Sequence, residues 1–191
     1  MSLIQNLIGS VIGDQVASQI AKATGLSEEQ TKKAVTMAMP LLISAMAKNS
    51  STQEGATSLN NALEKHNGTI LDNVDISSLL DSDDGTKITS HLLWENTQQT
   101  EAVIAKETGA DSSQIANIMK IAGPLLMGAV SKEKKSQGLD SAGLTGLLSH
   151  EKKTAQSDSG TMGMISNLID QNDDGSIIDD LMGFATKMMK K

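Results

Sequence analysis

The chain contains two copies of one stretch of 30 residues, and this repeat restricts the fold more than any other feature. Residues 19–48, QIAKATGLSEEQTKKAVTMAMPLLISAMAK, align without gaps on residues 103–132, VIAKETGADSSQIANIMKIAGPLLMGAVSK. Twelve of the 30 aligned positions are identical, and the only two prolines of the chain fall on each other. A repeat of this kind marks a duplicated supersecondary unit. The sequence therefore predicts two copies of one helical unit.

Each copy has the signals of two helices joined by a glycine. Gly25 and Gly109 stand where a residue of left-handed conformation ends a helix. Residues 27–30 (SEEQ) and 111–114 (DSSQ) then have the spacing of a capping box, which begins the next helix. We therefore expect a helix–turn–helix unit around each glycine.

A proline lies inside the long apolar stretch that follows in each copy. Because a proline within a helix costs about 3 kcal/mol, Pro40 and Pro124 predict a kinked or broken central helix. The segments PLLISAM and PLLMGAV are apolar on nearly every side, so they should be buried on most faces. Trp94 and Phe184 are the only large aromatic residues. The core must therefore be aliphatic, which favours helices over strands.

These signals predict an all-α fold, multihelical, with two copies of a helix-turn-helix-like unit plus a C-terminal helix. The expected divisions are a first helical repeat at 1–72, a second at 73–150, a flexible linker at 151–161, and an acidic loop and C-terminal helix at 162–191. The C-terminal helix should carry an apolar stripe that must pack against another surface. The stripe consists of Leu181, Met182, Phe184, Ala185, Met188 and Met189.

The charge of the chain argues against two classes of partner. The net charge is -7, and all 16 basic residues are lysines. Such a chain repels nucleic acid and anionic membranes, and it lacks the arginines that most often read guanine. Residues 104–119 do have the spacing of a DNA-binding helix-turn-helix, so a DNA binder stays as a second, disfavoured alternative. The absence of an apolar span or a leader predicts a cytoplasmic protein.

No set of residues indicates catalysis, and we nominate no catalytic residue. His66 and His150 lie 84 positions apart, at matching ends of the two copies, where a histidine favours helix carbonyls. His91 is expected on a helix flank beside Trp94. We therefore expect a non-enzymatic helical interaction or scaffolding protein, with a protein partner or self-association. The alternative is an enzyme or small-molecule binder with a site between the repeats.

An acidic stretch near the C-terminus, IDQNDDGSIIDDLMG, poses one sharper question. It has part of the spacing of a calcium-binding loop, and calcium is the only cofactor that we consider. The position of the final bidentate acid, however, is taken by Leu181. A helix cap at Ser176 is preferred, because the related stretch DDGT at 83–86 would have the matching cap Thr86. The candidate calcium ligands are Asp170, Asn172, Asp174, Ser176 and Asp180.

The doubled IAKxTG…PLL unit is accompanied by two further distinctive stretches, DGTKITSHLLW (84–94) and NDDGSIIDDLMGF (172–184). Together they resemble the YidB-like bacterial family, also called domain of unknown function 937. The resemblance spans most of the chain, although the region between the copies has fewer glycines than the family pattern. It implies a multihelical fold. It brings no activity, substrate or catalytic residue with it.

Overall fold

The structure is a computed structural model that describes residues 3–7, 9, 12–66 and 68–157. Within these ranges it contains helices and no strand, which confirms the all-α prediction. The α-helices are α1 (Leu3–Asn6), α2 (Asp14–Thr24), α3 (Glu28–Asn49), α4 (Gln53–Lys65), α5 (Ile76–Asp81), α6 (Asp84–Leu93), α7 (Thr97–Thr108), α8 (Ser112–Gln137) and α9 (Ser141–Ser157), with short 3-10 helices η2 (Thr69–Leu71) and η3 (Trp94–Asn96) between them.

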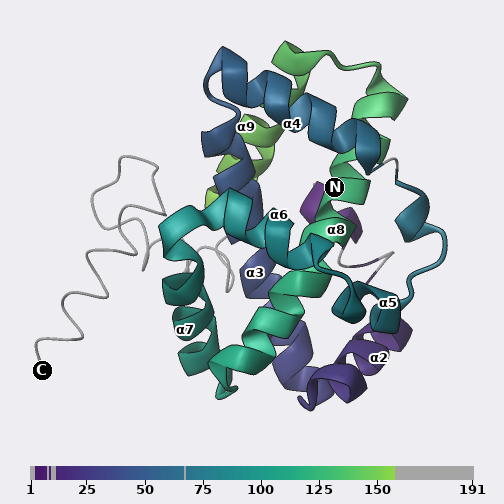
Figure 1. The fold of residues 1–191 in the computed structure, drawn as a ribbon, viewed down its shortest axis with the longest axis vertical. Coiled ribbons are helices and arrows are strands. Elements are labelled where there is room, and N and C mark those ends of the chain that lie inside the picture. Colours follow the sequence, from purple (N-terminus) through teal and green to yellow (C-terminus); the bar gives the residue numbers. More distant parts are fainter. Residues whose placement is uncertain (1–2, 8, 10–11, 67, 158–191) are drawn as a thin grey trace, which may run out of the picture.

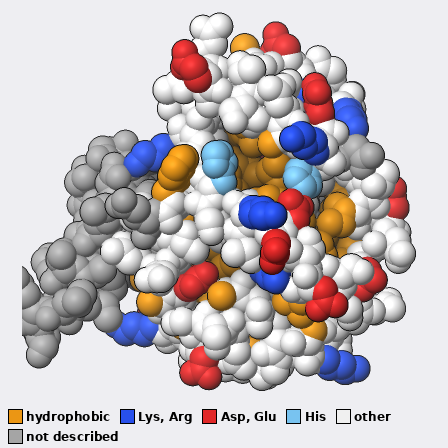
Figure 2. Space-filling model, in the orientation of Figure 1, with side chains coloured by type: hydrophobic (Ala, Val, Ile, Leu, Met, Phe, Trp, Pro, Cys, Tyr) orange, Lys and Arg blue, Asp and Glu red, His pale blue; other side chains and the backbone are white. Residues whose placement is uncertain are grey.

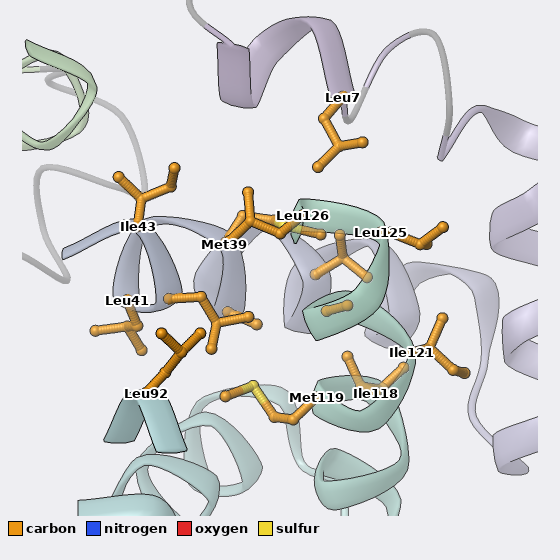
Figure 3. Packing of buried hydrophobic residues seen from close by; sticks show 14 of the residues in the cluster. Leu7, Met39, Leu41, Ile43, Leu92, Ile118, Met119, Ile121, Leu125 and Leu126 are labelled. Atoms are coloured by element: carbon orange, nitrogen blue, oxygen red, sulfur yellow. The ribbon is translucent and has the colours of Figure 1, made fainter. Parts of the chain in front are cut away.

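The two longest helices, α3 and α8, form the centre of the molecule, and the shorter helices surround them (Figure 1). Their apolar side chains meet those of α1 and α6 in one aliphatic core (Figure 3). In each unit the second helix is therefore a core helix, with α3 buried almost continuously from Ala34 to Ala47. The first turns of α3, up to Lys33, are largely exposed, and the rest of the helix is covered by other helices.

The predicted helix ends are confirmed in both copies. Gly25 ends α2 with a φ of 73°, and Gly109 ends α7 with a φ of 69°. Ser27 and Gln30 form a reciprocal capping box at the start of α3, with both hydrogen bonds 3.1 Å long. At the start of α8 the Gln114 side chain likewise accepts a bond from the backbone N–H of the capping residue, at 3.0 Å.

The expected break at the two prolines is absent. Helices α3 and α8 run continuously through Pro40 and Pro124. Each proline removes one backbone hydrogen bond, to the carbonyl of Thr36 or of Lys120 four residues earlier. The residues before and after both prolines are buried, and the burial of the apolar side chains around them offsets the lost bonds. Apolar packing on every side, rather than local propensity, keeps these helices whole.

The two units are joined by reciprocal hydrogen bonds from their capping glutamines. The side-chain nitrogen of Gln30 donates to the carbonyls of Thr108 and Gly109, both at 3.2 Å. The side-chain nitrogen of Gln114 donates to the carbonyls of residues 24 and 25, at 3.2 and 3.1 Å. Each glutamine thus begins one helix of its own unit and completes a helix end of the other unit.

Helix α9 extends further than the sequence suggested. It continues to Ser157, so the predicted linker begins too early, and residues 151–157 are helical. The reason is a buried face with helical spacing, which continues past residue 150. The residues of this face are Leu144, Leu148, Glu151 and Ala155. The rest of the linker and the predicted C-terminal helix lie outside the described residues.

In the described part of the chain, no helix combines the length and apolar character that crossing a membrane requires.

Candidate functional site

Helix α6 lies unusually close to α8 because both helices have a glycine at the contact. A Cβ atom at Gly85 would lie 1.9 Å from the carbonyl oxygen of Lys120, so only glycine fits there. At Gly123 a Cβ would lie 3.1 Å from the Ile88 side chain. Pro124 has no backbone N–H, so the carbonyl of Lys120, four residues earlier, lacks its hydrogen-bond donor within α8. The close approach of α6 therefore covers a carbonyl that the proline has freed.

Helix α4 runs beside α6 in the opposite direction (Figure 1). At one end, the side-chain nitrogen of Asn49, the last residue of α3, donates to the carbonyl of Leu92 at 3.2 Å. At the other end, Nδ1 of His66 lies 3.7 Å from a carboxylate oxygen of Asp84. The first contact fixes the end of α6 to the segment that leads into α4, and the second brings the other ends of α4 and α6 together. The surface between the two helices is open.

A groove of about 590 Å³ lies between α4 and α6, within the range of pockets that hold ligands. Figure 2 shows it as a hollow with hydrophobic side chains at the bottom and a histidine on each side. Helix α8 contributes part of the floor. The apolar lining consists of Leu59, Ala62, Ile88, Leu92 and Met127.

Trp94 lies at the end of this groove and is 64% exposed. Among the described residues it is the one large hydrophobic side chain with such exposure. Its φ of 50° is the only positive φ of a non-glycine residue in that part of the chain. The indole ring lies 5.3 Å from the ring of His91, at a tilt of 40°. A bulky residue in a conformation that favours glycine stores strain, and such strain concentrates at functional sites.

Charged groups differ between the two ends of the groove. His66 and the exposed Lys87 line the end where α6 begins, and Asp84 pairs with His66 there. Glu54 lines the opposite end, near Trp94. The groove therefore has the ammonium group of Lys87 at one end and the carboxylate of Glu54 at the other, with the apolar floor between them.

The carboxyl groups with shifted pKa values lie away from the groove. Hydrogen bonds from the Ser78 hydroxyl and from the backbone N–H groups of Ser78 and Ser77 lower the pKa of Asp75, which caps α5. Burial raises the pKa of Glu101 on α7. These groups serve helix ends and packing, and neither lines the groove.

The residues that the sequence nominated for calcium are not among those that the structure describes. Asp170, Asn172, Asp174, Ser176 and Asp180 all lie beyond residue 157, so the calcium hypothesis stays a prediction. Within the described ranges, no cluster of three or more histidine, aspartate or glutamate side chains could hold a metal ion.

The expected cap at Thr86 is wrong. Helix α6 begins at Asp84, and Thr86 lies within its first turn. The hydroxyl of Ser82 accepts the backbone N–H of Asp84 instead, at 3.1 Å. The reason is the contact of Gly85 with α8, which requires the DDG stretch to be helical already. The DDG stretch at 83–85 therefore belongs to the beginning of a helix that packs on α8.

The groove itself was not predicted from the sequence. His66 and His91 were interpreted as residues at helix ends or flanks, yet both line it. His150 lies on α9 and is exposed. The signal that could have indicated the groove is the stretch DGTKITSHLLW, because it ends in the only tryptophan of the chain.

Comparison with known proteins relates the chain to one family. Neither the curated proteins nor the solved structures gave a match. A family model does match residues 6–133, which include α2 to α7, most of α8 and all the groove-lining residues. The chain belongs to the family described as bacterial protein of unknown function, DUF937.

Proposed function

We propose that this chain is a non-enzymatic interaction module, and that the groove between α4 and α6 binds an amphipathic helix of a protein partner. The exposed indole of Trp94 at the end of an apolar floor is the observation that carries this proposal. Tryptophan is enriched among the few interface residues that supply most binding energy. A tryptophan kept exposed in a strained conformation is therefore a suitable anchor for a partner.

The shape of the groove fits a short helix. The α4 helix has 13 residues and α6 has 10, so the open surface between them is about 15 to 20 Å long. Three turns of a helix have about this length. Recognition of this kind places apolar residues at positions i, i+3, i+4 and i+7 into the groove.

The charges at the two ends specify the direction of the bound helix. Lys87 favours a carboxylate at the end where α6 begins, and Glu54 favours a lysine at the end near Trp94. The preferred partner is therefore a helix with an apolar stripe, an acidic residue near one end and a basic residue near the other.

A fluorescence titration tests the proposal, because Trp94 is the only tryptophan of the chain. The probe is a synthetic 14-residue helical peptide with Leu, Phe and Met on one face, aspartates in its first turn and lysines in its last. We expect the Trp94 emission to shift to the blue and the binding to saturate. A peptide with the same stripe and lysines at both ends should bind several-fold more weakly, because in either direction one of its ends then meets Lys87.

One exposed position supplies the variant for this titration. Lys87→Glu should reverse the preference between the two peptides. Absence of any emission shift up to millimolar peptide, or equal affinity of both peptides for both proteins, would contradict the proposed mode of binding.

The strain at Trp94 gives an independent test. Trp94→Gly and Trp94→Ala both remove the indole, but only glycine adopts a φ of 50° without strain. We therefore expect the free energy of unfolding of the glycine variant to be about 1 kcal/mol higher than that of the alanine variant. Equal stability of the two variants in urea would show that the backbone stores no strain there.

A small apolar ligand is the second candidate, because the volume of the groove suits one and because the groove lies between α4 of the first repeat and α6 of the second. An apolar naphthalene dye distinguishes the two functions. Saturable binding of this dye that Trp94→Gly weakens, with no binding of either peptide, would favour the small-molecule site.

A further inference from the structure

The groove between α4 and α6 has opposite charges at its two ends, and other described residues leave both of them unpaired. Lys87 and Glu54 line these ends, and both side chains are exposed. Within the described part of the chain, neither of them has an ion-pair partner. Trp94, at the Glu54 end, is 64% exposed. The groove thus presents both the charges and the apolar area that an amphipathic helix would cover.

The chain contains the sequence of such a helix beyond the described residues. Residues 177–190, IIDDLMGFATKMMK, follow the expected cap at Ser176, and we call them the tail segment. Apolar residues recur in it at positions i, i+4, i+7 and i+11, which lie on one face of a helix. These four residues are Ile177, Leu181, Phe184 and Met188. The sequence therefore predicts an apolar stripe along one side of the tail segment.

The charges of the tail segment follow the order that the groove requires. The sequence places Asp180 in the expected first turn and Lys190 in the last. Lys87 attracts the carboxylate and Glu54 attracts the ammonium group when the segment lies with its N-terminal end at the beginning of α6. The charges therefore specify one direction of binding.

We propose that the tail segment binds as a helix, in this direction, in the groove between α4 and α6 of its own chain. From Ile177 to Met188 such a helix is about 16 Å long, which matches the length of the open surface between α4 and α6. The stripe then lies on the apolar floor. Met188 lies against the ring of Trp94, and contacts between a sulfur atom and an aromatic ring are favourable.

The connection is long enough for the tail segment to reach the groove. Helix α9, which precedes it, packs against α4 and ends at Ser157. The nineteen residues 158–176 that follow can span up to about 60 Å. Helix α4 is itself one wall of the groove and is about 20 Å long, so the segment can lie along it in either direction.

Binding of the tail segment inhibits the groove, and this part of the inference rests on the proposed function. A tethered segment acts at an effective concentration of about 1 mM. With a Kd of about 0.3 mM it fills about three grooves in four, so a partner helix binds about fourfold more weakly than to an open groove. Added peptide still shifts the Trp94 emission of the full chain, in proportion to the share of open grooves.

Two variants of the full chain with the same change of charge test the docking. Leu181→Glu places a carboxylate in the stripe, and Thr186→Glu places one on the opposite face of the same helix. The Trp94 emission of the wild type is expected at a shorter wavelength than that of Leu181→Glu, because the docked segment covers the indole. The peptide probe should bind Leu181→Glu about fourfold more tightly than the wild type. Thr186→Glu should match the wild type in both measurements.

An exchange of charges tests the direction of binding. Asp180→Lys should shift the emission to longer wavelength, because its lysine then meets Lys87. Lys87→Glu alone should have the same effect, since two carboxylates then meet. The double variant brings opposite charges together again and should recover the wild-type emission, which two independent effects would not do. Additive shifts in the double variant would contradict the proposed direction.

Three results would overturn the docking itself. Equal emission of the wild type and Leu181→Glu would show that the tail segment does not cover Trp94. A shift in Thr186→Glu as large as that in Leu181→Glu would show that the stripe is not the contacting face. A wild-type emission that moves to longer wavelength on dilution would place the segment on a second copy of the chain.

The docking and the proposed function fail in different ways. A difference in emission between the wild type and Leu181→Glu, without peptide binding to either, would keep the tail segment as the occupant of the groove and remove the external partner. Equal emission and equal peptide affinity of these two proteins would overturn the docking and leave the proposed function intact.

Discussion

Helices α3 and α8 are the matching central helices of the two copies, but their surroundings differ. Both follow a glycine turn and a capping glutamine, and both contain a proline. Helix α8 has Gly123 and Gly128 where α3 has Met39 and Ser44. A Cβ at Gly128 would lie 2.6 Å from the Ile70 side chain, so this glycine too allows a close neighbour. The glycines of α8 let α6 and η2 approach closely, and this approach forms the floor and one wall of the groove.

The comparison separates two kinds of duplicated residue. The residues that end and begin helices are the same in both copies, because the joint between the units needs both sets. The residues on the outer face of the central helix have diverged, and with them the elements that pack there. The joint between the units is therefore the same in both copies, whereas the outer faces of the two central helices differ.

The largest expected effect tests whether the close contact of α6 and α8 is essential. Gly85→Ala places a Cβ 1.9 Å from the Lys120 carbonyl, a backbone atom that cannot move aside. We expect a loss of about 3 kcal/mol in the free energy of unfolding, although alanine normally favours a helix. Gly146→Ala on α9 is the control, since its Cβ meets nothing within 4 Å, and it should stabilise by about 0.5 to 1 kcal/mol. Urea unfolding of both variants measures these changes. Stabilisation by Gly85→Ala would contradict the close contact between α6 and α8.

The next effect compares the two glycine turns. Gly25→Val and Gly109→Val force a β-branched residue into the left-handed conformation, so each should cost about 1 to 2 kcal/mol. Gly25 should be the more sensitive, because its Cβ would lie 3.4 Å from the Gln114 side chain, against 3.9 Å between Gly109 and Gln30. Thermal melting of the pair checks both statements. Unchanged melting of either variant would show that its turn does not depend on glycine.

A third prediction addresses the reciprocal glutamines. Gln30→Glu keeps the capping-box acceptor but replaces the donor that bonds to the carbonyls of Thr108 and Gly109. We expect the free energy of unfolding to fall by about 1 to 2 kcal/mol, because two carbonyl oxygens then face another hydrogen-bond acceptor. Gln114→Glu should cost a similar amount. Chemical denaturation measures both, and a loss confined to one glutamine would show that the joint is not shared equally.

The smallest effect concerns an ion pair that only the first copy has. Nζ of Lys32 lies 2.6 Å from Asp14, whereas Gln98 and Ala116 occupy the corresponding positions of the second copy. The hydrogen bond and charge of Lys32 lower the pKa of Asp14, and the same bond raises the pKa of Lys32.

Asp14→Asn should therefore lower the melting temperature slightly at neutral pH. A lowered pKa means that the contribution is present above the ordinary pKa of the carboxyl group and is lost as the pH falls through the lowered value. The difference between wild type and variant should disappear in acid, and also in about 1 M salt, because the pair is exposed. A difference that persists in salt would indicate a role other than the ion pair.

Local signals allowed the helices and their joints to be predicted from the sequence. Gly25, Gly109 and the two capping boxes act within a few residues, so their spacing alone defines the structure. The continuity of α3 through Pro40 and the start of α6 before Thr86 could not be predicted in this way. Both depend on burial against helices that are distant in the sequence. The groove was missed for the same reason, since His66 and His91 become neighbours of one hollow only when α4 and α6 pack side by side.

The reciprocal glutamine bonds have a consequence for how such a chain can be divided. Gln30 completes a helix end of the second half, and Gln114 completes one of the first. Two identical subunits make contacts of this form across a twofold axis, where residue i meets j and j meets i. At this joint the chain thus has the reciprocal contacts that a homodimer has. Either half expressed alone would expose its half of this interface, and pairing with a second copy of itself would cover it.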